Sequence, residues 1–118
     1  MTPMKIIISH QEFIFTEEEF SRHWGSGMGR ADSIDGTVRL RSGLPPGTRE
    51  ATILHEILHL IADMNDLKIK DDDTVISVLA TQLLDFLRGN PELVAQICGR
   101  ESLMGSDCKP ERKNPIAV

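Results

Sequence analysis

Two histidines and a glutamate stand together in the most apolar part of the chain. The segment "TILHEILHLIAD" places His55 and His59 four positions apart, with Glu56 directly after the first histidine. Residues four apart lie on one face of an α-helix, so both imidazoles can reach one ion at about 2.0–2.1 Å. Glu56 lies about 100° further round the helix, beside that ion, where its carboxylate can take a proton from an attacking water. The H-E-x-x-H pattern therefore predicts a zinc (Zn²⁺) hydrolase with Glu56 as general base.

The same three residues could instead be ordinary polar positions of a helix, since so short a pattern also arises by chance. Here, however, they lie among six aliphatic side chains, in a helix that we expect to be buried. Burying an unpaired charge is costly, so these polar groups need partners. A metal ion in a water-filled cleft would supply them, and we favour a metal site over incidental polarity.

A catalytic zinc commonly has three protein ligands, so a third donor is required. Asp63 continues the spacing of four, but it would lie about 12 Å along the helix from His55, too far to share one ion. Asn65 occupies the place where metzincins carry a third histidine, and a carboxamide is a poor zinc ligand. The start of the next helix offers two aspartates. We predict Asp73 as the third ligand and Asp72 as second choice, against the alternative that both only cap the helix.

Strands and loops are predicted from alternation and from turn residues. The segment "KIIISHQEFIF" predicts a β-hairpin with its break at His10 and Gln11, and "GTVRLRS", residues 36–42, predicts a further strand. Thr16 followed by Glu19 forms a capping-box pattern, which predicts a short helix from Glu17 to about Trp24. The glycine-rich stretch after it, "GSGMG", lacks the lysine of a phosphate-binding loop and is interpreted as a connector.

Three longer helices are predicted from capping signals and apolar periodicity. Thr48 is the expected N-cap of the helix that carries the histidines, which should run over residues 49–64. Asp72 should cap a second helix that ends near Gly89, with the segment "NDLKIK" as the loop before it. Asn90 and Pro91 then start a third helix that runs to about residue 98.

Composition limits the class of protein. The chain has 118 residues, which suits one small domain, predicted over 1–98 with a flexible tail over 99–118. The net charge of −5 disfavours a nucleic-acid partner, which normally requires a basic stripe. No apolar run reaches the roughly 20 residues of a membrane span, and no signal peptide is recognised, so we expect a cytoplasmic protein without a membrane partner. Cys98 and Cys108 are expected to be free thiols.

The stretch from about Asp35 to Val94 resembles a family of small phage and prophage HExxH zinc metallopeptidases, distantly like the ImmA/IrrE-type minimal gluzincins. The segments that carry the resemblance are "IDGTVRLRSGLP", "TILHEILHLI" and "KDDDTVISVLATQLLDFLRGNPEL". It implies a compact α+β, zincin-like domain, in which a small antiparallel sheet of about three strands packs on a central HExxH helix and two or three further helices. It also implies that His55 and His59 are ligands and Glu56 the base. Gluzincins generally take a glutamate from the following helix as third ligand, whereas this chain has aspartates there.

The favoured function is thus a zinc metallopeptidase that hydrolyses a peptide or protein substrate in the host cytoplasm, if the chain is phage-encoded. The strand over residues 36–42 could hold an extended peptide by strand addition, or it could equally be plain sheet. The alternative is a non-catalytic phage-type protein that sequesters a host protein on a zincin scaffold. A metal-dependent RNase is disfavoured, because the third histidine and a basic surface are both lacking.

Overall fold

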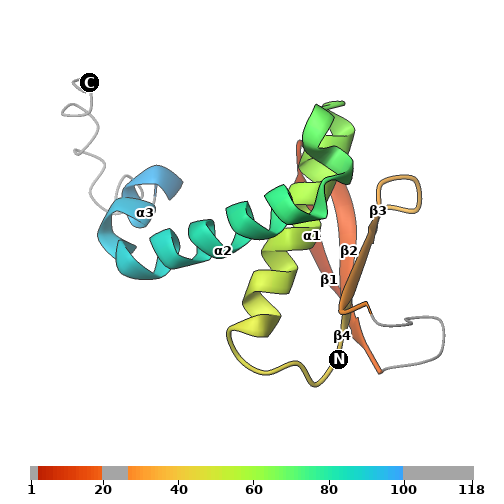
Figure 1. The fold of residues 1–118 in the computed structure, drawn as a ribbon, viewed down its shortest axis with the longest axis horizontal. Helices are drawn as coiled ribbons and strands as arrows, with labels where there is room; N and C mark the ends of the chain where they lie inside the picture. The colour runs from red at the N-terminus through yellow and green to blue at the C-terminus, as the bar shows by residue number, and fades with distance from the viewer. Residues whose placement is uncertain (1–2, 20–26, 100–118) are drawn as a thin grey trace. The chain divides into compact units, whose positions relative to one another are not determined.

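A computed structural model describes residues 3–19 and 27–99 of the chain. Within these residues it has an α+β architecture of a four-stranded sheet, three α-helices and one short 3₁₀ helix (Figure 1). In chain order the elements are β1 (Met4–Ile8), β2 (Gln11–Glu18), β3 (Gly29–Asp32), β4 (Thr37–Arg41), α1 (Thr48–Met64), η2 (Lys68–Asp71), α2 (Asp73–Gly89) and α3 (Pro91–Cys98). The predicted α+β class is therefore confirmed.

The chain divides into two compact units, Met1–Leu84 and Asp85–Val118, with the boundary inside α2. The first unit contains the sheet, α1, η2 and the start of α2, and thus every residue of the candidate site. The division into a domain over 1–98 and a tail stays a prediction, and nearly all of that tail lies outside the described residues. Among the described helices, none has the length and apolar character needed to cross a membrane.

The sheet is mixed, with the strand order β1-β2-β4-β3. β1 pairs with β2 and β3 with β4 in antiparallel fashion, but β2 and β4 run parallel, with Phe15 opposite Val38. The expected antiparallel sheet of about three strands is therefore wrong in strand number and in orientation. The missed strand is β3, whose sequence "GRAD" is too short to show alternation and begins with a glycine. β3 forms one edge of the sheet, and this edge borders the site.

The hairpin predicted at the N-terminus is present. Ser9 and His10 form its two-residue turn and have positive φ angles of 51° and 66°, as a type I′ turn requires. The prediction placed the turn one residue late, since Gln11 already pairs with Ile8. His10 is exposed in this turn, where it is not part of the candidate site.

The short helix expected from Glu17 is not formed at its predicted start. Thr16, Glu17 and Glu18 belong to β2, and Thr16 pairs with Arg39 of β4. The Thr16 hydroxyl donates a hydrogen bond to the Glu18 carboxylate at 3.1 Å instead of capping a helix. Sheet pairing thus overrides the local capping signal, as tertiary context often does. Residues 20–24 of the predicted helix and the first two residues of "GSGMG" lie outside the described residues.

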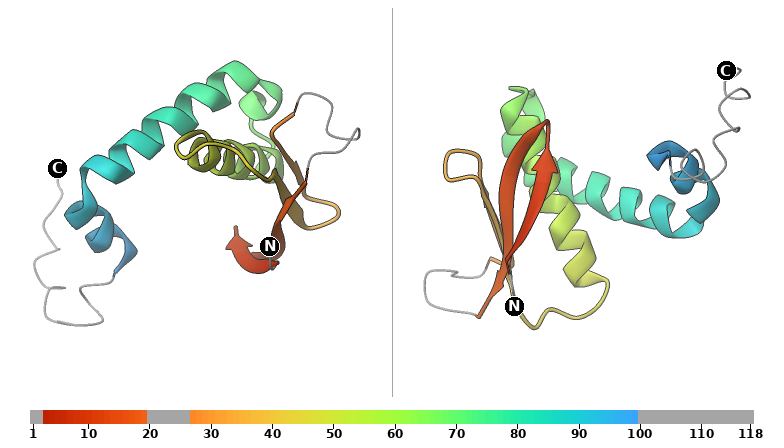
Figure 2. Two further views of the ribbon diagram at one scale, coloured as in Figure 1. Left: turned by 90° about the horizontal axis from the view of Figure 1, so that it is seen from below. Right: turned by 180° about the vertical axis from the view of Figure 1, so that it is seen from behind.

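The core lies between one face of the sheet and α1 (Figure 2). Phe13, Val38 and Leu40 are almost completely buried on this face of the sheet. From α1, side chains that recur at three- and four-residue intervals pack against them: Ile53, Ile57, Leu60, Ile61 and Met64. Because this stripe faces the sheet, the rotation of α1 about its axis is fixed, and with it the directions of the histidines.

Glycine, not threonine, precedes the first turn of α1. Gly47 is the N-cap, and its N–H donates to the Glu50 carboxylate at 2.6 Å, while Thr48 is already helical. The predicted Thr48 cap is therefore wrong by one residue. The φ angle of Gly47 is +90°, a conformation that threonine would adopt only with strain, so the chain turns into the helix at the glycine.

The start of α2 agrees with the prediction. The carboxylate of Asp72 accepts a hydrogen bond from the Val75 N–H at 3.1 Å, so Asp72 is the N-cap and Asp73 the first helical residue. The last three residues of the segment expected to be a loop before it belong to the 3₁₀ helix η2. α2 and α3 end as predicted, and Cys98 at the end of α3 is a free, exposed thiol, whereas Cys108 lies outside the described residues.

Candidate metal centre

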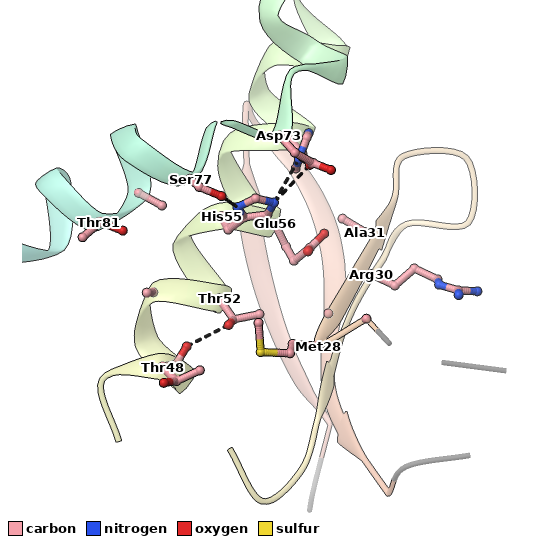
Figure 3. Close-up of a pocket in the computed structure, with 15 residues that line it drawn as sticks. Met28, Arg30, Ala31, Thr48, Thr52, His55, Glu56, Asp73, Ser77 and Thr81 are labelled. Carbon is pink, nitrogen blue, oxygen red and sulfur yellow. Dashed lines mark hydrogen bonds and ion pairs between the residues drawn. The ribbon is translucent and has the colours of Figure 1, made fainter. Parts of the chain in front are cut away.

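Three potential ligands converge between α1 and the first residue of α2. Nε2 of His59 lies 3.1 Å from Nε2 of His55 and 2.6 Å from Oδ1 of Asp73, and the third separation, from His55 to Asp73, is 3.4 Å. The two imidazoles come from consecutive turns of α1, and Asp73 reaches them because η2 brings the chain back beside this helix (Figure 3). The three donor atoms form a small triangle around one point.

This triangle fits a tetrahedral metal ion. Ligand atoms about 2.0–2.1 Å from a tetrahedral zinc would be separated from one another by about 3.3 Å. Two of the observed separations, 3.1 and 3.4 Å, are close to this value, and the third, 2.6 Å, is the length of a direct hydrogen bond. Two imidazole nitrogens and one carboxylate oxygen are also a donor set that catalytic zinc sites use. The residues present therefore suit a divalent cation.

Backbone and side-chain partners orient both imidazoles. Nδ1 of His59 lies 2.7 Å from the carbonyl oxygen of Lys70, which can only accept, so Nδ1 carries the proton of this hydrogen bond. Nδ1 of His55 lies 3.2 Å from the hydroxyl of Ser77 on α2. With their Nδ1 atoms engaged in this way, both rings turn Nε2 toward Asp73. Such second partners set the tautomer and direction of metal-binding histidines.

Charge and burial favour a neutral, metal-binding imidazole at His55. Burial lowers the pKa of this imidazole, the nearby His59 lowers it further, and Asp73 opposes the shift. The pKa of Asp73 is lowered chiefly by its hydrogen bond with His59, so its carboxylate stays ionised. A neutral nitrogen donor and an anionic oxygen donor are the forms that bind a metal.

Glu56 lies beside the triangle but does not belong to it. Its side chain extends from α1 toward β3, whereas Ser77 approaches His55 from the α2 side (Figure 3). Burial raises the pKa of the Glu56 carboxyl above its ordinary value; the nearby His59 opposes this shift, and the negative charge of Asp73 adds to it. A partly desolvated carboxylate with a raised pKa is a better proton acceptor, as a general base requires.

The site opens into a cavity of about 590 Å³ between β3, α1 and α2. This volume is in the range of ligand-binding clefts. Its walls combine the three donors and Glu56 with mostly small side chains, among them Ala31, Thr52, Ala80 and Thr81. Arg30 lies on β3 as well, but its side chain points away from the cavity (Figure 3). The cleft thus has reactive groups on α1 and an extended strand as its opposite wall.

Some backbone N–H and C=O groups of the edge strand β3 do not pair with β4. The Arg41 N–H donates to the Met28 carbonyl at 2.9 Å, and pairs that exchange hydrogen bonds alternate along an antiparallel ladder. Arg30 therefore bonds to β4, while the N–H and C=O groups of Gly29 and Ala31 point away from β4. β4 lies between β2 and β3, so residues 36–42 form an inner strand of plain sheet and not a site of strand addition. Among the described strands, β1 and β3 are the two edges, and β3 is the edge strand that lines the cleft.

The structure brings His55, His59 and Asp73 together, whereas the second choice Asp72 and the disfavoured Asp63 and Asn65 have other partners. Asp72 caps α2 with its side chain. Among the other candidates, the Asp63 carboxylate accepts a hydrogen bond from Ser33 at 3.1 Å, and the Asn65 amide donates to a carbonyl of its own helix. His23 lies outside the described residues.

Sequence reasoning missed the β3 wall of the cleft and the roles of Ser77 and the Lys70 carbonyl. Ser77 follows Asp73 by four residues, which places both on the same face of α2, and this spacing could have identified it. A backbone carbonyl has no sequence signal.

No protein-family model, no curated protein and no solved structure matches the chain.

Proposed function

We propose that the chain is a zinc-dependent metallopeptidase with a zincin-like domain, as the resemblance to small phage HExxH proteins implies. The observation that supports this most strongly is the convergence of His55, His59 and Asp73 within 3.4 Å, with Glu56 beside them on the cleft side. A structural zinc site would normally be closed by four protein ligands. Three donors, a neighbouring carboxylate and an open cleft are the features of a catalytic site instead.

Each residue then has a defined task. His55, His59 and Asp73 hold the ion, and Ser77 and the Lys70 carbonyl keep the two imidazoles turned toward it. A bound zinc would supply Lewis acidity, which activates water and polarises a carbonyl group. Glu56 accepts the proton of the attacking water and returns it to the leaving amine. The partial burial of Glu56 supports this role, since it raises the pKa of the carboxyl.

The substrate would lie extended along β3. The outward backbone groups of Gly29 and Ala31 can pair with a peptide strand, as exposed sheet edges do. Such a peptide passes in front of Glu56, because Gly29 lies directly against the Glu56 side chain. The small side chains lining the cavity favour recognition of the peptide backbone over recognition of large side chains.

The test is zinc content followed by cleavage of a broad peptide library. Wild type should bind one zinc ion and cleave, and Glu56→Gln should keep the ion but lose about 100- to 10,000-fold in turnover, the usual contribution of a general base. Asp63→Asn is the matched control, since it removes a carboxylate from the same helix outside the donor triangle. Zinc binding without cleavage of any library member would count against an enzyme.

The alternative, a scaffold that sequesters a host protein, makes the opposite prediction for the same variant. Glu56→Gln would then leave the biological effect intact, whereas changes to exposed surface residues would abolish it. The raised pKa of Glu56 and its position facing the cleft favour the enzyme, because a scaffold needs neither.

A further inference from the structure

Gly29, the first residue of β3, lies against the side chain of Glu56. A Cβ placed on Gly29 would be 2.9 Å from Cγ of Glu56, 3.0 Å from Cγ2 of Thr52 and 3.2 Å from Oε2 of Glu56. Favourable contacts between carbon atoms are about 3.5–4.0 Å, so even a methyl group does not fit here without displacement. The space that a side chain would occupy is already filled by Glu56.

Backbone conformation does not explain this glycine. Gly29 is not among the glycines with positive φ, which are Gly36, Gly43, Gly47 and Gly99. It lies in a regular strand opposite Leu40, where glycine is unfavourable for strand stability. The close approach to α1 is therefore the feature that accounts for the absence of a side chain.

Of the groups around Gly29, Glu56 is the one that would move if a side chain were added. The β3 backbone is held by its pairing with β4. Thr52 is buried, and its hydroxyl donates to the Thr48 carbonyl at 2.7 Å, which fixes the direction of its methyl group. The Glu56 side chain has several rotatable bonds and faces an open cavity, so it would swing out of its place beside the donor triangle.

We propose that Gly29 is a positioning residue for Glu56. The missing side chain creates the space in which the Glu56 carboxylate is held between the edge strand and the donors His55, His59 and Asp73. Gly29 does not itself touch the reacting atoms. It acts through Glu56, and its importance for turnover therefore rests on the function proposed above, while the steric coupling of the two residues does not.

A double-mutant cycle in thermal unfolding tests the coupling without any activity. In metal-free protein, Gly29→Ala should lower the melting temperature by about 4–8 °C, the shift expected for a mild overpacking in a small domain. In the Glu56→Ala background, which lacks Cγ and the carboxylate, Gly29→Ala should lower the melting temperature much less. Gly89→Ala is the control, because a Cβ there meets nothing within 4 Å. An equal fall in melting temperature in both backgrounds overturns the proposal. So does a result in which Thr52→Ser, and not Glu56→Ala, removes the destabilisation caused by Gly29→Ala.

Zinc binding and kinetics test the consequence. Gly29→Ala should bind zinc with the stoichiometry and affinity of wild type, because the three donors are untouched. Its kcat should fall by about 10- to 100-fold, part of the contribution of a general base, while KM changes little. A positioning role is contradicted if Gly29→Ala loses zinc binding as well as kcat, or if its kcat is unchanged. If wild type cleaves nothing, the proposed function fails, and the thermal cycle still decides whether Gly29 and Glu56 are coupled.

Discussion

The hydroxyl of Ser77 lies 3.2 Å from Nδ1 of His55, so a side chain of α2 supports an imidazole of α1 from the side opposite the ligand triangle. Ser77→Ala removes this support and lets the ring rotate. We expect zinc affinity to fall by about tenfold, the lower end of the effect of such outer contacts. Competition with a chromophoric chelator measures it. Thr81→Ala, in the wall of the same cavity, should retain wild-type zinc affinity. An equal loss of affinity in both variants would show that the hydroxyl of Ser77 has no specific role in holding His55.

Asp73 and Asp72 are adjacent but have different roles. Asp73→Asn replaces the anionic donor 2.6 Å from His59 by a carboxamide, so we expect zinc affinity to fall by more than the 10- to 100-fold typical of outer contacts, roughly 100-fold or more. Asp72→Asn should have little effect, since asparagine is as good an N-cap as aspartate and the Val75 N–H keeps its acceptor. Isothermal titration of both variants measures the difference. The reverse order of affinities would make Asp72 the ligand.

Sequence reasoning placed the donor triangle because its signals are local. The spacing of His55 and His59 fixes their common face once a helix forms, and helix formation follows from the apolar periodicity around them. Asp73 could be chosen because Asp72 has the position of a cap. These inferences depend on a few consecutive residues.

The sheet could not be predicted in the same way, because pairing between distant strands decides it. β3 has four residues and no alternation, and it exists because it can pair with β4. Thr16 and Glu19 carry a helix-start signal, but the parallel pairing of β2 with β4 keeps Thr16, Glu17 and Glu18 extended. The proximity of Gly29 and Glu56 follows from this pairing and from the packing of α1, so no local pattern indicates it.

Metal binding should stabilise the fold, since the ligands come from two helices that unfolding separates. At a free zinc concentration 100-fold above Kd, the free energy of unfolding should rise by about 2.7 kcal/mol, measured as a higher melting temperature. The gain should shrink as the pH falls from 7 to 5, because protons then compete for the imidazoles; burial lowers the pKa of His55, so its ring is neutral at pH 7. His55→Ala should abolish the gain, and a zinc effect that survives this change would place the ion elsewhere.

Glu17 of β2 and Arg49 of α1 form a paired hydrogen bond, with Nε and Nη2 of Arg49 donating to the two carboxylate oxygens at 2.8 and 2.9 Å. Only 13% of the Glu17 side chain is exposed, so we expect Glu17→Gln to lower the free energy of unfolding at pH 7 by about 1–2 kcal/mol, as for other charge-assisted pairs. Glu12→Gln is the control, since the Glu12–Lys5 pair is 3.5 Å long and mostly exposed, and little change is expected there.

The contribution of Glu17 should depend on pH in one direction. The hydrogen bond from Arg49 holds the pKa of Glu17 below its ordinary value of 4.5 in the folded protein. The unfolded chain therefore binds the proton more readily, and the stabilisation is fully present above pH 4.5 and is lost as the pH falls through the lower, folded-state pKa. Denaturant unfolding of wild type and Glu17→Gln between pH 7 and pH 2.5 should show two curves that converge only at the acidic end. A constant difference across this range would mean that the pair stabilises the link between β2 and α1 by packing and not by charge.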